Sequence, residues 1–401
     1  MSVAEAALVR LRPRKEKPVL NRHPWIFSGA IAGVSGDPAD GDLVTVADHA
    51  GQRLARGYIN SRSQITVRIL TWDLDEAIDA AFWRRRLQGA LAGRDLLGLG
   101  GERTSAYRLA NAESDGLPGL VVDRYGAYLA VQFLTLGIER WRETLLDLLE
   151  ELCRPAGIYE RDDVAVRRKE GLAKQMGPLR GQTPPDLVEI RENGRRFLVD
   201  MKAGQKTGFY LDQRENRARV AAHAAGRQVL NCFSYTGGFS VYAGLAGAAS
   251  VTNVDVSPEA LALCARNMAL NGLGDLRGES VVGNVFEELR RYREEGRRFD
   301  LVILDPPKFA ASQAQFQRGA RGYKDIKVRA LLILRPDGLL ATFSCSGAVD
   351  ADLFQKILFG ASLDAGRPVQ MLETLIQAPD HPILLSFPES HYLKGAICRV
   401  G

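Results

Sequence analysis

The stretch QVLNCFSYTGGFSVYAGLAGA (residues 228–248) decides the fold class, because a short apolar run leads through a glycine pair into a longer helix-forming segment. The same order returns downstream, where SVTNVDVS precedes PEALALCARNMALNG and FDLVILDPP precedes YKDIKVRALLILRPDG. Regular alternation of strand and helix predicts an α/β domain with a mostly parallel sheet and helices on both faces. In such open sheets the ligand binds beside the carboxyl ends of the strands.

The glycine pair Gly237–Gly238 lies at the turn from the first strand to its helix, where a ligand can approach the backbone closely. Its spacing is neither G-x-G-x-x-G nor G-x-x-x-x-G-K-S/T, which disfavours a dinucleotide and a triphosphate. A glycine pair at such a turn is also common for packing alone, so the loop by itself leaves both interpretations open.

Polar residues end the next three strands. Asp255 is placed to accept both hydroxyls of a ribose; capping of the next helix falls instead to Ser257, directly before Pro258, which leaves Asp255 free. Asn284 ends the third strand, where its amide can meet an adenine edge, and Asp305 ends the fourth. A site for ribose and adenine without a phosphate-binding signature indicates S-adenosylmethionine.

The cysteines are scattered, without the spacing of a zinc site or of a disulfide framework. Cys345, in FSCSG, ends the fifth strand and is either a small buried hydrophobe or a nucleophile. Its flanking serines and the DPP turn of the neighbouring strand favour the nucleophile. Cys345 and Asp305 can then converge on one base.

Outward from this domain, three segments differ in pattern. Residues 1–75 read as short strands with turn signals, typical of a small β barrel, and residues 76–190 mix helices and strands. KQMGPLRGQTPPDL has the composition of a linker, which predicts a boundary near 180–190 before the alternating segment 191–401. A chain of 401 residues is expected to form two or three domains, and the three segments suit three.

Composition narrows the class of protein. With 46% hydrophobic and 25% charged residues, and no apolar run near the roughly 20 residues of a membrane span, we expect a cytoplasmic protein without a membrane partner. The net charge is only +5, but six Lys or Arg face a single Glu between Arg10 and Arg22. That segment is either a solvated surface or one that contacts phosphates.

Several motifs of this chain occur in the same order as in a known enzyme family. The chain resembles the bacterial 23S rRNA cytosine-C5 methyltransferases of the large ribosomal subunit, and the match runs from NRHPWIFSGAI through RLANAESDGLPGLVVDRYG to the final YLKGAICRV. The ordered motifs are GQKTGFYLDQRENR, NCFSYTGGFS, NVDVS, LDPPKF, RGYKDI and FSCSG.

The resemblance implies an N-terminal PUA-like RNA-binding domain (1–75), a central α/β domain (76–190) and a class I methyltransferase domain with a seven-stranded sheet (191–401). It implies methylation of C5 of one cytosine in 23S rRNA with S-adenosylmethionine as cofactor, and leaves monomer and homodimer open. The alternatives are methylation of guanine N2 or uridine C5 on the same fold, and a non-catalytic RNA-binding scaffold.

The resemblance also implies the cofactor site. Asp255 takes the ribose, Asp305 lies near the methionine end, and Tyr210 belongs to a lid over the pocket. The family usually has Asp where this chain has Asn284, whose carbonyl can still accept an adenine amino proton. The loop along the cofactor consists of Phe233, Ser234, Tyr235, Thr236 and Gly237.

The chemistry explains why a cysteine is needed. A thiolate added at C6 of cytosine breaks the aromaticity and makes C5 a nucleophile, and the resemblance assigns this role to Cys345. Many RNA cytosine-C5 methyltransferases carry a second cysteine where this chain has Lys308, so their release scheme does not apply unchanged. Lys308, Arg321 and Tyr323 are candidates for binding RNA phosphate or stacking on a base, although a basic loop is often merely solvated.

Overall fold

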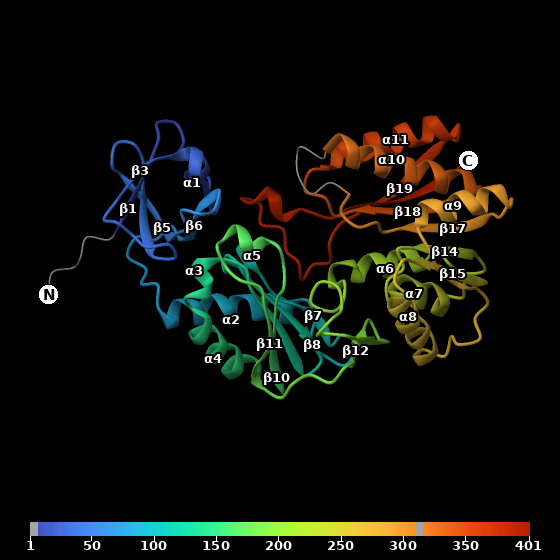
Figure 1. Cartoon of the computed structure of the whole chain (residues 1–401), viewed down its shortest axis with the longest axis horizontal. Coiled ribbons are helices and arrows are strands. Elements are labelled where there is room, and N and C mark those ends of the chain that lie inside the picture. Colours follow the sequence, from blue (N-terminus) through green and yellow to red (C-terminus); the bar gives the residue numbers. More distant parts are fainter. Residues whose placement is uncertain (1–6, 310–315) are drawn as a thin grey trace. The chain divides into compact units, whose positions relative to one another are not determined.

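The computed structural model describes residues 7–309 and 316–401, and the chain forms two compact units (Figure 1). The first unit consists of Met1–Ile190, Val199–Leu211 and Pro379–Ser390. The second unit consists of Arg191–Leu198, Asp212–Ala378 and His391–Gly401. Both units therefore contain segments that are distant in the sequence.

The N-terminal part of the first unit is a six-stranded sheet with strand order β2-β6-β5-β4-β1-β3, as the turn-rich pattern predicts. Val9, Leu11, Val46 and Val67 lie in its core without exposed surface. Its elements are β1 (Leu8–Leu11), α1 (Lys17–Leu20), β2 (Trp25–Phe27), η1 (Ser28–Ala30), β3 (Ile31–Ser35), β4 (Leu43–Ala47), β5 (Arg53–Ile59) and β6 (Ile65–Thr71).

A five-stranded sheet with strand order β11-β10-β9-β8-β7 follows it. Its edge strand β11 occupies the first half of the stretch whose composition we read as a linker, and that interpretation is wrong for residues 175–181. Pro178 pairs with Tyr159 beside a register shift, and an edge strand tolerates proline there because no ladder bond is lost. The elements are α2 (Ala80–Leu96), β7 (Ala106–Asn111), η2 (Ala112–Asp115), β8 (Leu120–Tyr125), β9 (Tyr128–Phe133), α3 (Leu136–Glu139), α4 (Arg142–Cys153), β10 (Gly157–Asp162), α5 (Val166–Lys169) and β11 (Gln175–Gly181).

Tyr58 of β5 joins the two sheets of the first unit. Its ring lies in the core formed by the central sheet, where a Cβ on Gly137 would come within 2.1 Å of it. Its hydroxyl bonds to Thr135 Oγ1 at 2.8 Å and donates to the Pro118 carbonyl at 3.0 Å. The N-terminal sheet thus shares a core with its neighbour, and removing it would expose that core.

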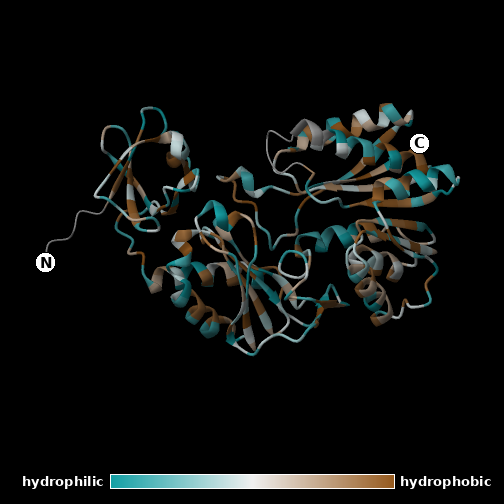
Figure 2. Ribbon diagram, viewed as in Figure 1, coloured by the Kyte–Doolittle hydropathy of each residue, from teal (hydrophilic) through white to brown (hydrophobic). Residues whose placement is uncertain are grey.

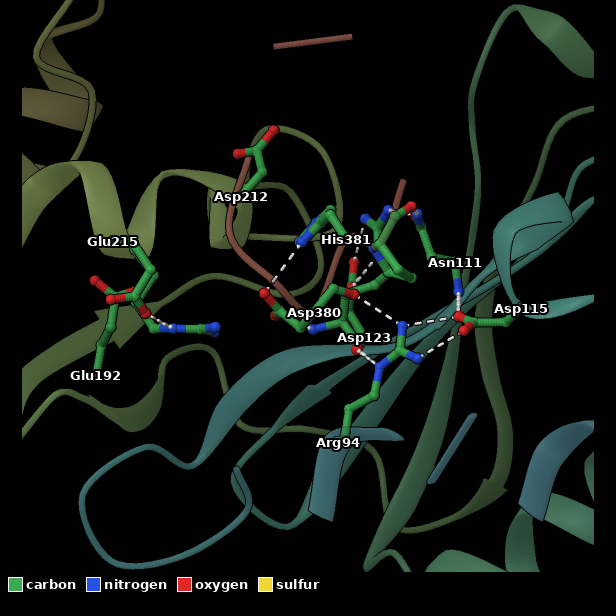
Figure 3. A network of polar contacts seen from close by, with 12 residues as sticks. Arg94, Asn111, Asp115, Asp123, Glu192, Asp212, Glu215, Asp380 and His381 are labelled. Atoms are coloured by element: carbon green, nitrogen blue, oxygen red, sulfur yellow. Dashed lines mark hydrogen bonds and ion pairs between the residues drawn. The ribbon is translucent and has the colours of Figure 1, made fainter. Parts of the chain in front are cut away.

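The segment Pro379–Ser390 is held within the first unit by buried polar contacts (Figure 3). Asp380 has no exposed surface and accepts a hydrogen bond from the Arg108 amide at 2.9 Å. Arg94 donates to the Asp380 carbonyl at 2.8 Å and to both carboxylate oxygens of Asp115. These contacts fix a segment that is almost 300 residues away from Arg94 in the sequence.

The segment Val199–Leu211 is anchored in the same way. The Thr207 hydroxyl donates to Asp123 Oδ2 at 2.6 Å, and Arg108 donates to both oxygens of the same carboxylate. The Tyr125 hydroxyl contacts Thr207 Oγ1 at 2.8 Å. The GQKTGFY motif is therefore fixed to strand β8 of the first unit.

The second unit contains a seven-stranded sheet with strand order β16-β15-β14-β17-β18-β20-β19. Only β20 runs antiparallel to its neighbours, which confirms the expected mostly parallel sheet. The chain builds outward from β14 to β16 and then returns to β17 on the other side of β14, so a topological switch point lies between β14 and β17. The strands are β14 (Gln228–Cys232), β15 (Ser250–Asp255), β16 (Ser280–Val282), β17 (Phe299–Leu304), β18 (Leu334–Ser344), β19 (Val369–Leu375) and β20 (Lys394–Val400).

Helices cover both faces of this sheet. Val302 and Leu304 of β17 pack in a core with residues of α9–α11, whereas Leu301 and Ile303 pack on the other side with residues of α6 and α7. These strands are mostly hydrophobic, brown in Figure 2. The helices are α6 (Arg214–Ala221), α7 (Gly238–Leu245), α8 (Pro258–Leu270), α9 (Val285–Glu294), α10 (Phe316–Ile333) and α11 (Ala351–Ala365); the remaining elements are β12 (Val188–Glu192), β13 (Arg195–Val199), η3 (Leu211–Gln213) and η5 (Pro388–Ser390). Within the ranges that the structure describes, no helix has the length and apolarity to cross a membrane.

Candidate active site

The loop after β14 has an unusual backbone. Phe233, Tyr235 and Gly237 have φ angles of 58°, 47° and 80°, all in the left-handed region. A residue with a side chain adopts this conformation at a cost of about 1–2 kcal/mol, and such strain concentrates at ligand sites. The strained loop coincides with the one that, by the family resemblance, is expected to lie along the cofactor.

Hydrogen bonds donated by backbone amides tie this loop to the end of the next strand. The Ser234 amide donates to the Val254 carbonyl at 3.1 Å, and the Tyr235 amide donates to Asp255 Oδ2 at 2.8 Å. The carboxyl ends of β14 and β15 are thereby held together.

The hydrogen bonds of Ser257 are as expected, but those of Asp255 are not. The Ser257 hydroxyl accepts from the Ala260 amide at 3.1 Å, which confirms it as the N-cap of α8. The expectation that Asp255 has no local role is wrong, because its Oδ1 also accepts from the Ser257 amide at 3.0 Å. Each carboxylate oxygen still has a second lone pair, so hydrogen bonds from ribose hydroxyls remain compatible with these contacts.

Two buried hydroxyls of the loop suit a polar ligand. Ser234 and Thr236 are 5% and 3% exposed, and neither hydroxyl has a hydrogen-bond partner among the described residues. Buried polar groups are almost always hydrogen-bonded, so a group outside the chain is expected to satisfy these two. The amino acid end or the adenosine of S-adenosylmethionine carries suitable donors and acceptors.

Gly237 provides a test of the loop geometry. A Cβ there would lie 2.4 Å from Cys264 Sγ, in addition to the unfavourable φ of 80°. Gly237→Ala is therefore expected to lower the free energy of unfolding by about 2–5 kcal/mol, measured by urea denaturation. The matched control is Gly226→Ala, where φ is 69° but no atom lies within 4 Å, with an expected loss of about 1–2 kcal/mol. Equal losses in the two variants would contradict the assigned contact.

Asn284 is exposed and caps helix α9. Its side-chain oxygen accepts from the Phe286 amide at 2.9 Å, so the carbonyl that we expected to face adenine already serves the helix. A contact of Asn284 with adenine stays a prediction.

An aromatic cluster that the sequence pattern did not predict lies beside these polar groups. Phe309 follows the DPP motif, and its ring centroid is 6.4 Å from that of Phe233, 5.8 Å from that of Phe286 and 4.7 Å from that of Tyr323. Phe233, Phe286 and Phe309 are partly exposed. They provide the apolar wall that a flat heterocycle requires.

Asp305 follows β17 and is oriented by two amides. Gln213 Nε2 donates to Asp305 Oδ2 at 3.0 Å, and Asn216 Nδ2 donates to Gln213 Oε1 at 2.6 Å. Both amide side chains are 2% exposed. Gln213 belongs to the GFYLDQ motif, of which the sequence analysis singled out only Tyr210.

Cys345 follows β18, the strand next to β17. Leu304 pairs with Thr342, which brings the segments that carry Asp305 and Cys345 to one edge of the sheet. Cys345 is partly exposed, whereas the other four cysteines are at most 8% exposed. Burial raises the pKa of Cys153 to about 11 and those of Cys264 and Cys398 to about 12. Cys345 is thus the accessible thiol.

Tyr323 does not fit its predicted contact with RNA. The residue is 1% exposed, and its hydroxyl donates to the Pro307 carbonyl and accepts from the Phe309 amide, both at 3.4 Å. It supports the turn after Asp305 from within the core. Lys308 and Arg321 are exposed, and neither forms an ion pair with any residue that the structure describes.

Tyr210 belongs to the first unit, whereas the other predicted site residues belong to the second. Its hydroxyl donates to Gln205 Oε1 at 2.5 Å, and the Lys206 ammonium lies 5.8 Å from its ring centroid. Its role as part of a lid stays a prediction.

Family models and curated relatives match this arrangement. The model of S-adenosylmethionine-dependent methyltransferases matches residues 174–384, and that of PUA-like domains matches residues 9–72. Ribosomal RNA large subunit methyltransferase I of Shewanella amazonensis is 50% identical over 392 residues, covering 98% of this chain and 99% of the relative. The proteins of the same name from Tolumonas auensis and Klebsiella pneumoniae are 52% and 48% identical, with 98% and 96% of both chains covered.

Solved structures agree on the fold. A SAM-dependent methyltransferase from Streptococcus mutans has a TM-score of 0.85 at 23% identity, covering 98% of this chain and 99% of that one. A methyltransferase structure complexed with SAH gives the same values.

Proposed function

The chain belongs to the family of S-adenosylmethionine-dependent methyltransferases of large-subunit ribosomal RNA, and from this premise we propose that it methylates C5 of a cytosine in 23S rRNA through a covalent bond to Cys345. The observation that carries the proposal is the accessible thiol of Cys345 at the sheet edge that also carries Asp305. An enzyme that methylates an exocyclic nitrogen requires no thiol at this place.

The cofactor is S-adenosylmethionine, which when bound supplies the methyl group. We assign its binding to the loop Phe233–Gly237 and to Asp255. The unpartnered hydroxyls of Ser234 and Thr236 and the remaining lone pairs of Asp255 support this assignment. The aromatic cluster supports a position for the adenine ring beside Phe286.

The reaction on the base follows from the two residues at the sheet edge. The Cys345 thiolate forms a bond to C6, and the electron pair of the C5–C6 double bond becomes available to C5. Asp305, oriented by Gln213 and in its carboxylic acid form, gives a proton to N3 as the thiolate adds. After C5 has taken the methyl group, it loses its proton to a base. The C6–S bond then breaks, and Asp305 takes back the N3 proton.

The test is the identity of the product. A 23S rRNA transcript treated with the enzyme and S-adenosylmethionine is digested to nucleosides and analysed by mass spectrometry, and we expect 5-methylcytidine at one position. Finding N2-methylguanosine or 5-methyluridine instead would refute the cytosine assignment. No methyl transfer to any RNA would favour the scaffold alternative.

The basic segment near the N-terminus supports RNA binding. Its six cationic side chains are all exposed, and none forms an ion pair with a described residue. Phe27, which follows this segment in the sequence, is 47% exposed and presents an aromatic ring to solvent. The cations are Arg10, Arg12, Arg14, Lys15, Lys17 and Arg22.

Neutralising this segment tests the assignment. For the triple variant Arg10→Gln, Arg12→Gln and Lys15→Gln we expect weaker RNA binding. The slope of the logarithm of the RNA-binding constant against the logarithm of the salt concentration should also become shallower by about 2. Each lost contact with a phosphate of single-stranded RNA lowers the magnitude of this slope by about 0.7. Fluorescence anisotropy at several salt concentrations measures both.

The matched control neutralises three other exposed arginines, Arg290, Arg293 and Arg298 of the second unit. An equal change of slope in the control, or no change in the test variant, would show that residues 10–22 do not contact phosphate. Neutralisation is preferable to deletion because the N-terminal sheet shares the core around Tyr58.

A further inference from the structure

Lys394 is a buried cation beside the accessible thiol. It is 6% exposed, and its ammonium donates to the carbonyls of Ser346 and Tyr392, both at 2.8 Å. In the antiparallel pairing of β18 with β20, its Cα partner is Ser344. Lys394 therefore contacts the chain on both sides of Cys345, through the residue before it and the residue after it.

Burial of this ammonium without a carboxylate requires an explanation. No Asp or Glu forms an ion pair with Lys394 in residues 7–309 and 316–401, although buried cations are usually paired. Burial lowers the pKa of Lys394, while the neighbouring Cys345 and Asp350 favour its charged form. Electrostatic coupling is mutual, so the ammonium favours the ionised form of the Cys345 thiol.

We propose that Lys394 is a positioning residue that fixes the segment Ser344–Ser346 through hydrogen bonds and stabilises the Cys345 thiolate through its charge. The use of that thiolate as the nucleophile rests on the function proposed above. The ionisation of the thiol does not, because it is a property of the protein without RNA.

The other charged groups around this pair do not replace Lys394. Lys308 is exposed and lowers the pKa of Lys394 by repulsion, so it adds to the positive field. The pKa of His391 is lowered by burial and by Lys394, which keeps the imidazole neutral near pH 7. Asp350, the N-cap of α11, is exposed, and its negative charge weakens the positive field of Lys308 and Lys394.

Two further groups, Tyr323 and Asp305, also lie in this field. Burial raises the pKa of Tyr323, and the charges of Cys345 and Asp305 raise it further, so Tyr323 is a neutral neighbour. In its ionised form, the Asp305 carboxylate disfavours a second anion nearby. Lys394 is thus the buried cation that offsets this repulsion at Cys345.

The test is the pH dependence of thiol reactivity in the full-length protein. Iodoacetamide alkylation is followed from pH 5 to 10, and peptide mass spectrometry assigns the product to Cys345, with Cys345→Ala as the blank. For the wild type we expect a midpoint below the ordinary cysteine value of about 8.5. Lys394→Met is expected to move the midpoint up by about one pH unit, which slows alkylation at pH 7 about tenfold.

Further variants distinguish the effect of the positive charge of Lys394 from the effect of its hydrogen bonds. Lys394→Arg keeps the charge and should stay near the wild-type midpoint, whereas Lys394→Gln keeps hydrogen-bonding capacity without charge and should behave like Lys394→Met. Arg399 lies on the same strand as Lys394 and forms a surface ion pair with Asp337 of β18; Arg399→Met removes this pair and should leave the midpoint unchanged. An unchanged midpoint in Lys394→Gln, or an equal shift in Arg399→Met, would overturn the proposal.

A measurement on the wild type needs no lysine variant. Thiolate absorbance near 240 nm, taken as the difference from Cys345→Ala, titrates the thiol directly. A midpoint at or above about 8.5 would overturn the proposal, whatever the folding of the variants. If the midpoint depends on Lys394 but Cys345→Ala still methylates RNA, the inference stands and the proposed nucleophile fails.

Discussion

Replacing Cys345 with alanine is expected to lower the rate of methyl transfer at least about 10³-fold, because it removes the thiol that forms the bond to C6 and makes C5 a nucleophile. The side chain is partly exposed at the end of β18, so the loss of one sulfur should leave the free energy of unfolding nearly unchanged. Single-turnover transfer of a labelled methyl group to 23S rRNA measures the effect.

Cys398 provides the matched control for this variant. It lies on β20, 1% exposed, with its pKa raised by burial. Cys398→Ala is expected to cost stability through a small cavity but to keep a methyl-transfer rate near that of the wild type. Near-normal turnover of Cys345→Ala would contradict the covalent mechanism, and an equal rate loss in Cys398→Ala would assign the effect to folding.

The second large effect is expected at Asp305. Asp305→Asn preserves the shape of the side chain but has no proton to give to N3, and we expect the single-turnover rate to fall about 10²–10⁴-fold. Asn can still contact Gln213, so the fold and the position of the turn should be kept. Rapid-quench kinetics with saturating cofactor and RNA measures the rate of the chemical step.

Gln213→Ala distinguishes the orientation of the Asp305 carboxyl group from its role in proton transfer. It removes the amide that holds Asp305 Oδ2 but leaves the carboxyl group in place, so a smaller loss of about tenfold is expected. In the double variant the two losses should not add, because both act through one carboxyl group. A rate for Asp305→Asn within a few-fold of the wild type would refute the assigned role.

The architecture was predictable because strand and helix patterns are local. The run from Gln228 to Ala248 contains the strand, the loop and the helix that define the α/β class, and the order of the later segments extends it to the whole sheet. Strand β11 was missed since Pro178 and its glycines resemble a linker. A proline is tolerated there only because β11 is an edge strand, which depends on tertiary context.

The sequence predicted which residues of the site follow the strands, but it did not predict which side chains contact them. Asp255, Asp305 and Cys345 follow three strands, and their residue types indicated the chemistry. Gln213 and Lys394 lie in motifs that the resemblance uses, yet their partners are 92 and 48 residues away. No local pattern reveals a hydrogen bond over such a distance.

Tyr323 shows where a pattern was available and overlooked. The loop after the DPP motif was read as a basic surface, but α10 begins at Phe316 and includes Tyr323. Tyr323, Ile326, Lys327 and Ala330 are all buried, at spacings of three, four and seven residues. That spacing is the buried face of a helix, and it predicts Tyr323 in the core rather than against RNA.

Trapping the covalent intermediate tests the central claim most directly. In RNA with 5-fluorocytidine at the target position, C5 carries fluorine in place of the proton that must leave, so the bond between Cys345 and C6 cannot be released. With S-adenosylmethionine we expect a protein–RNA complex that survives denaturing electrophoresis and whose peptide mass spectrum places the nucleotide on Cys345. A complex attached to another residue, or no stable complex despite methylation of unmodified RNA, would contradict the account.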